Sequence, residues 1–288
     1  MNDIKICVLG GDSRMVSAAR FMCKQNYSVS VFGINGIVTE ATICNDLESA
    51  VTGASLIVLP LPFSTDGIKL FAPLCNFEIK ISDIISLLKN GQLVTGGKLS
   101  EDFCKKVVQN GCASFDYYLS ERLSVLNAIP TAEGAVSIAI NETTKTIFGS
   151  KCVIAGYGRI GKILAKLLKN MGADVTVFAR SEQALTWAEA DGCHACTFCC
   201  ANRHLNDKDI IFNTIPALWM NKNIIDSTKS DAVIIDLAST PGGVDFEYAK
   251  SVSKKVIFAL SLPGKVAPES AGNIIADCVL SKLKGGLL

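Results

Sequence analysis

Lys151-Cys152-Val153-Ile154-Ala155-Gly156-Tyr157-Gly158-Arg159-Ile160-Gly161 is the most informative segment of this chain. A short apolar run ends in G-x-G-x-x-G and a helical pattern follows over residues 162–168, which is the strand–turn–helix context of a dinucleotide-binding fingerprint. Gly156 permits the tight turn, Gly158 lets the backbone approach a pyrophosphate, and Gly161 permits close helix–strand packing. The helix N-terminus supplies free N–H groups to the phosphates. We therefore expect cofactor contacts from the turn, namely Gly156, Tyr157, Gly158, Arg159, Ile160 and Gly161; a glycine-rich turn in another α/β protein is the alternative.

The residues after the second strand predict which dinucleotide binds. NAD-binding folds place an acidic residue about 20 positions beyond the glycines, where it binds the ribose 2′-hydroxyl. Here the strand 174–179 is followed by Arg180 and Ser181. A guanidinium can hold a 2′-phosphate in a forked geometry, and Ser181 can add a hydrogen bond while capping the next helix. The sequence therefore predicts NADP, with an exposed arginine at a strand end as the alternative.

Strand and helix patterns alternate along both halves of the chain. This spacing predicts an α/β fold with two doubly wound, parallel-sheet, Rossmann-like domains linked by hinge helices. The Gly10-Gly11 turn of the first half lacks the G-x-G-x-x-G spacing, so that half is expected to bind another ligand. The expected strands are 4–11, 29–33, 55–59, 92–95, 112–115, 151–155, 174–179, 193–198, 209–213, 232–236 and 256–259, and the expected helices include 13–24, 82–89, 100–109 and 268–283.

The boundary between the halves is predicted from a break in the pattern at Asn127-Ala128-Ile129-Pro130. Thr131 is a suitable N-cap for a new helix that follows this proline. We expect a substrate or partner domain over 1–128, a hinge helix over 129–146, an NADP-binding domain over 147–266, and a C-terminal helix over 267–288 that returns to the first domain. Ligands are expected outside the carboxyl ends of the strands, in a cleft between the domains.

Composition excludes several classes of function. The chain has 288 residues, 49% of them hydrophobic, and a net charge of +1. A net charge this close to zero does not indicate a protein that binds nucleic acid or an acidic membrane surface. No apolar run is expected to reach the ~20 residues that cross a bilayer, and the N-terminal residues do not read as a signal peptide. A cytoplasmic protein is predicted.

Twelve cysteines include a cluster, Cys193-His194-Ala195-Cys196-Thr197-Phe198-Cys199-Cys200, with His204 nearby. Such thiols and imidazoles could hold zinc. The cluster, however, coincides with an expected strand, whose successive side chains point to opposite faces. We therefore predict no metal site and interpret these thiols as packing or incidental residues.

Three motifs carry a resemblance to a known family. They are Asn127-Ala128-Ile129-Pro130-Thr131-Ala132-Glu133-Gly134-Ala135, Asp236-Leu237-Ala238-Ser239-Thr240-Pro241-Gly242-Gly243, and Leu262-Pro263-Gly264-Lys265-Val266-Ala267-Pro268-Glu269-Ser270-Ala271-Gly272. Together with Asn213-Thr214-Ile215-Pro216, they make the chain resemble the A-subunit of dipicolinate synthase over essentially its whole length. The resemblance implies NADP-linked oxidation of dihydrodipicolinate, formed from a hydroxytetrahydrodipicolinate precursor, to dipicolinate in sporulating bacteria. It also implies the flavoprotein-like B-subunit of dipicolinate synthase as partner; a second copy of the chain is a further candidate partner.

Residues near the nicotinamide are expected at the ends of the fourth and fifth strands of the second half. Small and apolar groups there shield the path of the hydride, which points to Thr214, Ile215, Pro216, Leu237 and Ala238. More distantly, the chain is similar to alanine dehydrogenase, whose Pro-Gly-x-Val-Pro segment near the nicotinamide implies that Pro263 and Gly264 contact the cofactor.

The implied substrate is a small dicarboxylate, so cationic side chains should bind it, arginine being best suited to forked carboxylate binding. Candidates are Arg14 and Lys98, which each follow a Gly-Gly pair at a strand end, together with Arg122, Lys265 and the hydroxyl of Ser13. As a base for the ring proton we expect Glu133, in the first turn of the hinge helix, although the helix dipole there weakens a carboxylate as a base. Lys98 is the second catalytic candidate, and water is the remaining one.

Two other interpretations remain open. Lys98 followed by Asp116 resembles the acid–base pair of a shikimate-dehydrogenase-like enzyme. Alternatively, the chain binds NADP without catalysing a reaction and regulates a flavoprotein partner. Substrate profiling tests the first interpretation, and turnover by the isolated chain tests the second.

Overall fold

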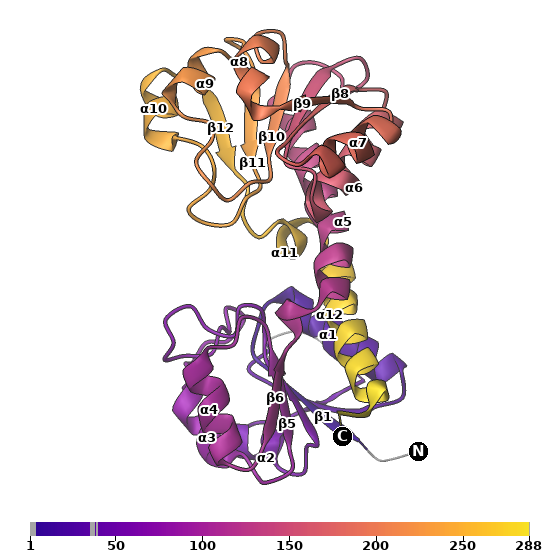
Figure 1. Cartoon of the computed structure of the whole chain (residues 1–288). Helices are drawn as coiled ribbons and strands as arrows, with labels where there is room; N and C mark the ends of the chain where they lie inside the picture. Colours follow the sequence, from indigo (N-terminus) through magenta and orange to yellow (C-terminus); the bar gives the residue numbers. More distant parts are fainter. Residues whose placement is uncertain (1–3, 35–37, 39, 288) are drawn as a thin grey trace. The chain divides into compact units, whose positions relative to one another are not determined.

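The computed structural model describes residues 4–34, 38 and 40–287 (Figure 1). The chain divides into two compact units, one within the ranges Met1–Asn127 and Ala267–Leu288, the other over Ala128–Val266. Each unit is built around its own parallel sheet.

The first unit contains a six-stranded sheet in the order β3-β2-β1-β4-β5-β6, with every neighbouring pair parallel. Its strands are β1 (Lys5–Leu9), β2 (Ser28–Phe32), β3 (Thr42–Ile43), β4 (Leu56–Val58), β5 (Leu93–Gly96) and β6 (Ala113–Asp116). Its helices are α1 (Ser13–Lys24), α2 (Leu47–Val51), α3 (Ile81–Leu87), α4 (Glu101–Gln109), η1 (Tyr117–Leu119), α12 (Pro268–Lys282) and η3 (Leu283–Leu287).

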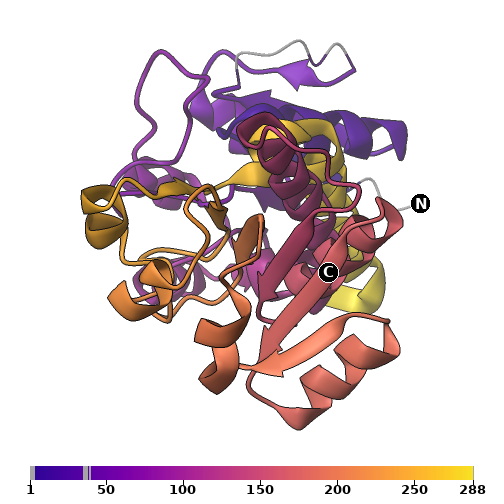
Figure 2. The same ribbon diagram turned by 90° about the horizontal axis from the view of Figure 1, so that it is seen from above.

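Both faces of this sheet are covered. Ile6 and Val8 of β1 face one apolar cluster, and Cys7 and Leu9 face the other, as the alternation of a strand requires. Helices α1 and α12 lie side by side on the first face (Figures 1 and 2). The two helices approach each other closely at Gly272, where a Cβ would lie 2.2 Å from the carbonyl oxygen of Arg14. Only glycine fits at this position.

The second unit repeats the design in the order β12-β11-β10-β7-β8-β9, again entirely parallel. Its strands are β7 (Lys151–Ala155), β8 (Asp174–Ala179), β9 (His194–Thr197), β10 (Ile210–Asn213), β11 (Val233–Asp236) and β12 (Lys255–Phe258). Its helices are α6 (Arg159–Asn170), α7 (Glu182–Ala190), η2 (Phe198–Cys200), α8 (Ala201–His204), α9 (Lys222–Asp226), α10 (Phe246–Ser251) and α11 (Leu262–Val266), with most of α5 (Glu121–Glu142).

The central strands of this sheet are apolar and buried on both faces. Ile154 and Phe212 pack into one cluster and Val153 and Ile211 into the other. Such continuous apolar runs are typical of parallel sheets covered by helices. The prediction of two doubly wound, Rossmann-like α/β domains is confirmed.

The expected start of a new helix after Asn127–Pro130 is wrong, although the two units do divide between Asn127 and Ala128. Helix α5 runs without interruption over Glu121–Glu142 with Pro130 inside it, so Thr131 is not an N-cap and Glu133 is not in a first helical turn. Proline removes one backbone hydrogen bond, but tertiary packing supplies most of a helix's stability in proteins. Buried small residues flank the proline. The buried residues of α5 are Leu123, Ala128, Pro130, Ala132, Gly134, Ala135, Val136 and Ala139.

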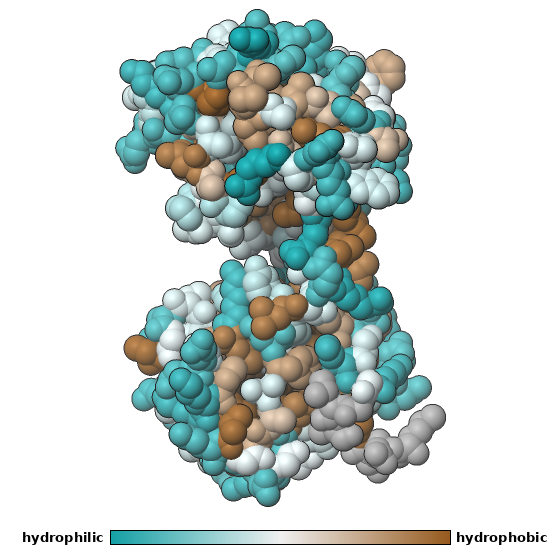
Figure 3. Space-filling view, in the orientation of Figure 1, coloured by the Kyte–Doolittle hydropathy of each residue, from teal (hydrophilic) through white to brown (hydrophobic). Residues whose placement is uncertain are grey.

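The expectation that no apolar run reaches bilayer length also needs correction. Among the described residues, α5 contains an 18-residue window of mean hydropathy 1.4, and half of that window is buried within the protein. A core helix of a globular protein has the same properties. Figure 3 shows an apolar patch where α5 lies in the view of Figure 1. Ile129 and Ile140 of this helix are exposed.

Candidate functional site

In the glycine turn after β7, steric contacts require two of the three glycines and leave the third free. Gly156 has φ +96°, and a Cβ there would lie 2.4 Å from Oγ1 of Thr214. A Cβ on Gly161 would lie 2.1 Å from the carbonyl oxygen of Gly156. Around Gly158, in contrast, a Cβ would meet no described atom within 4 Å. The fold therefore requires Gly156 and Gly161, while the space beside Gly158 is open to a ligand.

Helix α6 begins directly after Gly158 and no side chain caps its N-terminus. Its first turn contains no acidic residue, so its free N–H groups and positive dipole end can receive an anion. An open approach at Gly158 beside an uncapped twelve-residue helix fits the pyrophosphate of a dinucleotide. Arg159 is exposed at this point, and Ile160 packs against the core beneath the turn.

Tyr157 contributes to the structure of the turn. Its side chain is buried and its hydroxyl donates a 2.5 Å hydrogen bond to Oδ2 of Asp191, beyond α7. Burial, and then this hydrogen bond, raise the pKa of Tyr157 above its usual range. Lys162 lies over its ring, 5.8 Å from the centroid. The side chain therefore ties the turn to α7, leaving its backbone available to a cofactor.

Arg180 and Ser181 follow β8 at the carboxyl edge of the same sheet. Arg180 is exposed and makes no hydrogen bond or ion pair with the described residues. Ser181 is the N-cap of α7, as expected, and its Oγ accepts a 3.2 Å hydrogen bond from the amide of Ala184. The Ser181 hydroxyl proton remains available to a second acceptor.

Two buried side chains at the ends of β10 and β11 hold the neighbouring loops. Asp236 is fully buried, and its carboxylate accepts hydrogen bonds from Nδ2 of Asn213 (2.8 Å), the amide of Ala238 (3.0 Å) and the amide of Gly243 (2.8 Å). Oδ1 of Asn213 accepts from the amide of Ile215 (3.0 Å) and from Nε1 of Trp219 (2.8 Å). Reasoning from the sequence missed this pair; a polar residue closing each of two adjacent apolar strands was the available signal.

The other expected cofactor residues lie around this pair or on α11. Oγ1 of Thr214 donates to the carbonyl of Ala155 (2.8 Å), which joins the loop after β10 to the end of β7. Ile215 and the exposed Pro216 continue that loop. Leu237 and Ala238, directly after β11, are buried. Pro263 and Gly264 lie in α11, whose Leu262 and Val266 pack against Gly134 of α5.

In the first unit, Arg14 already has an anionic partner. Its Nε and Nη2 form a forked pair with Asp12, at 2.9 and 2.8 Å, and Nη2 also donates to the carbonyl of Leu61. The Arg14 side chain is only 12% exposed. Asp12, rather than the exposed Ser13, caps α1. Arg14 therefore supports the loop that follows β4. The edge of its guanidinium that could bind a substrate carboxylate is occupied by Asp12.

Lys98 lies exposed at the carboxyl end of β5, with φ +61°. Its ammonium lies over the ring of Tyr118, 5.1 Å from the centroid. Asp116 accepts its hydrogen bonds from the backbone amides of Lys98 (3.2 Å), Leu99 (2.9 Å) and Tyr118 (2.8 Å). The carboxylate thus orders the loop and is not paired with the Lys98 ammonium. Gly97 is required by packing, since a Cβ there would lie 2.5 Å from Leu61.

Three further predicted residues lie on helices α5 and α11. Arg122 forms an exposed ion pair with Asp277 of α12, at 2.7 Å. Lys265 is exposed on α11. Glu133 is exposed on α5 and lines a groove with Leu167 and Met171, from the C-terminal part of α6 and the residue after it. That groove lies beyond the middle of α6, away from the glycine turn at its start.

Comparison with known proteins identifies the relatives of this chain. Residues 5–118 match the family described as the N-terminal domain of the dipicolinate synthase A-subunit. The chain is 31% identical to the dipicolinate synthase A-subunit of Bacillus subtilis, over 98% of its own length and 96% of that protein. This chain belongs to the dipicolinate synthase A-subunit family.

Solved structures of this family share the whole architecture. The A chain of dipicolinate synthase from Bacillus subtilis has a TM-score of 0.87 at 31% identity, covering 99% of this chain and 97% of that one. The A-subunit from Bacillus halodurans has a TM-score of 0.88 at 30% identity, covering 98% and 97%. An L-alanine dehydrogenase shares the fold, with a TM-score of 0.65 at 14% identity over 97% of this chain and 89% of that one.

Residues 131–241 match the NAD-binding domain of D-isomer specific 2-hydroxyacid dehydrogenases. This range contains the glycine turn, Arg180 and the Asn213–Asp236 pair. The relationship to the dipicolinate synthase A-subunit and this domain together support an oxidoreductase that binds a nicotinamide dinucleotide.

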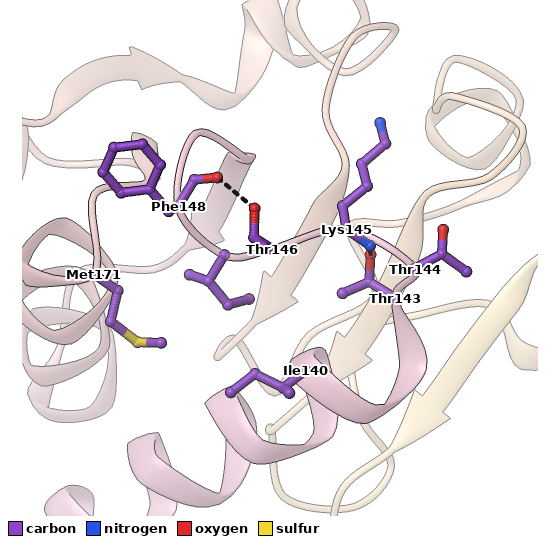
Figure 4. Close-up of a pocket in the computed structure, with 8 residues that line it drawn as sticks. Ile140, Thr143, Thr144, Lys145, Thr146, Phe148 and Met171 are labelled. Atoms are coloured by element: carbon purple, nitrogen blue, oxygen red, sulfur yellow. Dashed lines mark hydrogen bonds between the residues drawn. The ribbon is translucent and has the colours of Figure 1, made fainter.

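A hollow of about 620 Å³ lies at the amino-terminal edge of the second sheet. It is lined by the segment that precedes β7 in the sequence and by Met171, the residue that follows α6. Figure 4 shows Ile140, Phe148 and Met171 around it, with Thr146 Oγ1 donating to the carbonyl of Phe148. Because cofactors of doubly wound sheets bind at the carboxyl ends of the strands, this hollow is not the dinucleotide site. Within the described ranges, no group of three or more His, Cys, Asp or Glu side chains is arranged to hold a metal.

Proposed function

We propose that this chain is the NADP-dependent oxidoreductase component of a cytoplasmic dipicolinate synthase. Its reaction would be the oxidation of dihydrodipicolinate, formed from a hydroxytetrahydrodipicolinate precursor, to dipicolinate during sporulation. One observation carries the cofactor part of the proposal: the space beside Gly158 is open at the uncapped start of α6. The substrate part rests on the family, whose Bacillus subtilis member is named as part of a dipicolinate synthase.

Arg180 supports NADP over NAD. The residue that follows β8 is an exposed arginine without a partner among the described residues, where NAD-binding folds have a carboxylate. A planar guanidinium binds a phosphate through two parallel hydrogen bonds. The spare hydroxyl proton of Ser181 can donate to the same phosphate.

The oxidised nicotinamide, when bound, accepts the hydride that the substrate ring loses. Within the second unit, the start of α6 binds the pyrophosphate, and the Asn213–Asp236 pair holds the loops over residues 214–219 and 237–243 in a fixed conformation. Such preorganisation lowers the cost of orienting reactants. Leu237 and Ala238 keep water from the buried end of β11. Loss of the ring proton makes the product aromatic, so water suffices as the proton acceptor.

For a substrate carboxylate we assign Lys98 first. Its ammonium is exposed at a strand's carboxyl end and rests on the face of Tyr118, whereas the fork of Arg14 is filled by Asp12. Lys265, exposed on α11, is the cation that we assign from the second unit. Arg122 is engaged by Asp277, and Glu133 lines a groove beyond the middle of α6, so we give neither a role in the reaction.

The lack of an Asp116–Lys98 side-chain pair counts against a shikimate-dehydrogenase-like mechanism. The flavoprotein-like B-subunit of dipicolinate synthase is the proposed partner, because the named relatives are A-subunits or A chains of a synthase.

The test is NADP⁺ reduction, followed by absorbance, with enzymatically generated dihydrodipicolinate. The purified chain is assayed alone and with the flavoprotein-like partner, beside Gly158→Ala as the cofactor-site variant. We expect turnover that depends on this chain and is lost in Gly158→Ala. Turnover by the complex that is unaffected by Gly158→Ala would assign the chemistry to the partner. Absence of turnover in a protein that binds NADPH would overturn the assignment of dihydrodipicolinate as the substrate.

A further inference from the structure

Two adjacent cysteines follow β9 at the carboxyl edge of the second sheet. Sγ of Cys199 lies 3.8 Å from Sγ of Cys200, and 2.8 Å from Oγ1 of Thr197. Cys199 is exposed and Cys200 is half-buried. The proposed oxidoreductase mechanism uses neither thiol.

The surroundings of Cys199 favour its thiolate. Hydrogen bonds with Thr197 and then Cys200, followed by the charge of Arg203, lower the pKa of Cys199. Burial raises the pKa of Cys193 and Cys196 in the same segment. Since the thiolate is the reactive form, Cys199 is the nucleophile of this segment and Cys200 is the nearest second thiol.

We propose that Cys199 and Cys200 form a dithiol site that exchanges with low-molecular-weight disulfides to give a reversible Cys199–Cys200 disulfide. The Cys199 thiolate attacks one sulfur of the small disulfide, forming a mixed disulfide and releasing one thiolate. Cys200 loses its proton to water and attacks Sγ of Cys199, which releases the second small thiolate. The protein pair thereby gives up two electrons and two protons, and the small disulfide is reduced to two thiols.

Reversibility follows from the chain geometry. Neighbouring Cα atoms are about 3.8 Å apart, which is closer than the roughly 4.4–6.8 Å that relaxed disulfides span. A bond between adjacent cysteines is therefore strained and readily reduced, as labile and regulatory disulfides are.

The site is connected to the cofactor edge through packed residues. Thr197 pairs with Ala179 across β9 and β8, so the residues that follow each strand, Phe198 and Arg180, leave the same sheet edge. The ring of Phe198 lies 5.2 Å from that of Trp219, and Trp219 donates to Asn213. Closing the disulfide would move the turn that bears Phe198. We therefore infer that oxidation weakens NADPH binding, and this part rests on the proposed cofactor function.

Oxidised glutathione is the probe, applied to the full-length protein, with intact-mass and peptide-mass readouts that do not depend on NADPH. We expect the mass of the wild-type protein to fall by two hydrogens as the Cys199–Cys200 disulfide forms, and dithiothreitol should restore the original mass. Cys200→Ser should instead retain one glutathionyl group on Cys199, and Cys199→Ser should acquire neither product. Cys75→Ser, a half-buried cysteine in the first unit, is the matched control and should behave as wild type.

In the reduced protein, Cys199 should react with iodoacetamide about tenfold faster than Cys193, because burial raises the pKa of Cys193 and the rate follows the thiolate fraction. Failure of Cys199 to form the mixed disulfide in Cys200→Ser, or a wild-type disulfide that joins Cys199 to Cys196, would overturn the site. NADPH titration then tests the coupling, with an expected loss of about fivefold in affinity on oxidation. Unchanged affinity in a protein shown to be oxidised overturns the coupling alone; absence of NADPH binding in both forms contradicts the proposed function instead.

Discussion

Nδ2 of Asn213 donates a 2.8 Å hydrogen bond to Oδ1 of Asp236, and both side chains are fully buried at the paired ends of β10 and β11. Each side chain also bonds the backbone of the loop that follows its own strand. Two loops that border the expected nicotinamide position are thereby fixed by one interaction. A buried carboxylate is tolerated here because three donors satisfy it.

Asp236→Ala should destabilise the second unit. It leaves one side-chain amide and two backbone N–H groups without their acceptor, at a cost of about 3 kcal/mol or more. Urea unfolding followed by tryptophan fluorescence is a suitable measurement because both tryptophans, Trp187 and Trp219, lie in this unit. Asp231→Ala is the control: that carboxylate is 62% exposed in an ion pair with Lys229, and its loss should cost less than about 1 kcal/mol. Equal losses would contradict the assigned role of Asp236.

Gly158→Ala and Gly161→Ala should separate binding from folding. A methyl group at Gly158 meets no described atom within 4 Å, and its φ of −87° suits alanine. We expect Gly158→Ala to leave the melting temperature within about 2 °C of wild type while weakening NADPH binding at least about tenfold, or 1.4 kcal/mol. Gly161→Ala places Cβ 2.1 Å from the carbonyl oxygen of Gly156, so it should lower the melting temperature itself. Thermal unfolding and calorimetric titration of both variants provide the comparison.

Local signals were sufficient to predict much of the fold. The bounds of helix α1 were predicted correctly from its amphipathic run, Ser13–Lys24. Strand β8 was predicted at Asp174–Ala179 because a buried apolar run ends at the polar Arg180 and Ser181. The G-x-G-x-x-G turn also has the predicted strand and helix on either side.

Partners distant in sequence could not be predicted in the same way. Asn213 and Asp236 form a pair only because β10 and β11 are neighbours with their ends in register. Arg14 follows a Gly-Gly turn, a position from which an arginine could bind an anion. In the structure, however, its guanidinium is held by the carboxylate of Asp12 and by the carbonyl of Leu61, which lies 47 residues away. Pro130 predicted a helix boundary from local stereochemistry, yet burial of the small residues around it keeps α5 continuous.

Stability of the second unit should fall in acid through Asp209. Burial alone would raise the pKa of Asp209, but hydrogen bonds from Lys145 (2.6 Å), Lys229 (2.8 Å) and the Lys151 amide (3.0 Å) lower it well below the usual range. A lowered folded-state pKa contributes stability above the unfolded value of about 3.9, and this contribution disappears as the pH falls through the folded-state pKa.

Asp209→Asn should therefore cost about 2 kcal/mol at pH 7, and the difference from wild type should shrink steadily below about pH 4. Urea unfolding of both proteins across this range is the measurement. Asp102→Asn, which removes an exposed pair with Lys106 in the other unit, is the control and should cause little change. A difference that is constant from neutral to acid pH would exclude titration of Asp209 as its cause.

Arg180→Ala should reduce NADPH binding far more than NADH binding. The two cofactors differ only in the 2′-phosphate, and loss of charge-assisted hydrogen bonds worth about 1.5–3 kcal/mol corresponds to a loss of roughly tenfold to a hundredfold in NADPH affinity. Arg203→Ala is the matched control, since it removes the same charge from an exposed residue of α8. If long-range attraction dominated, both variants would weaken NADPH binding alike and salt would abolish the effect. A forked contact instead gives a loss specific to Arg180, and equal losses for NADPH and NADH in Arg180→Ala would show that this arginine does not read the 2′-phosphate.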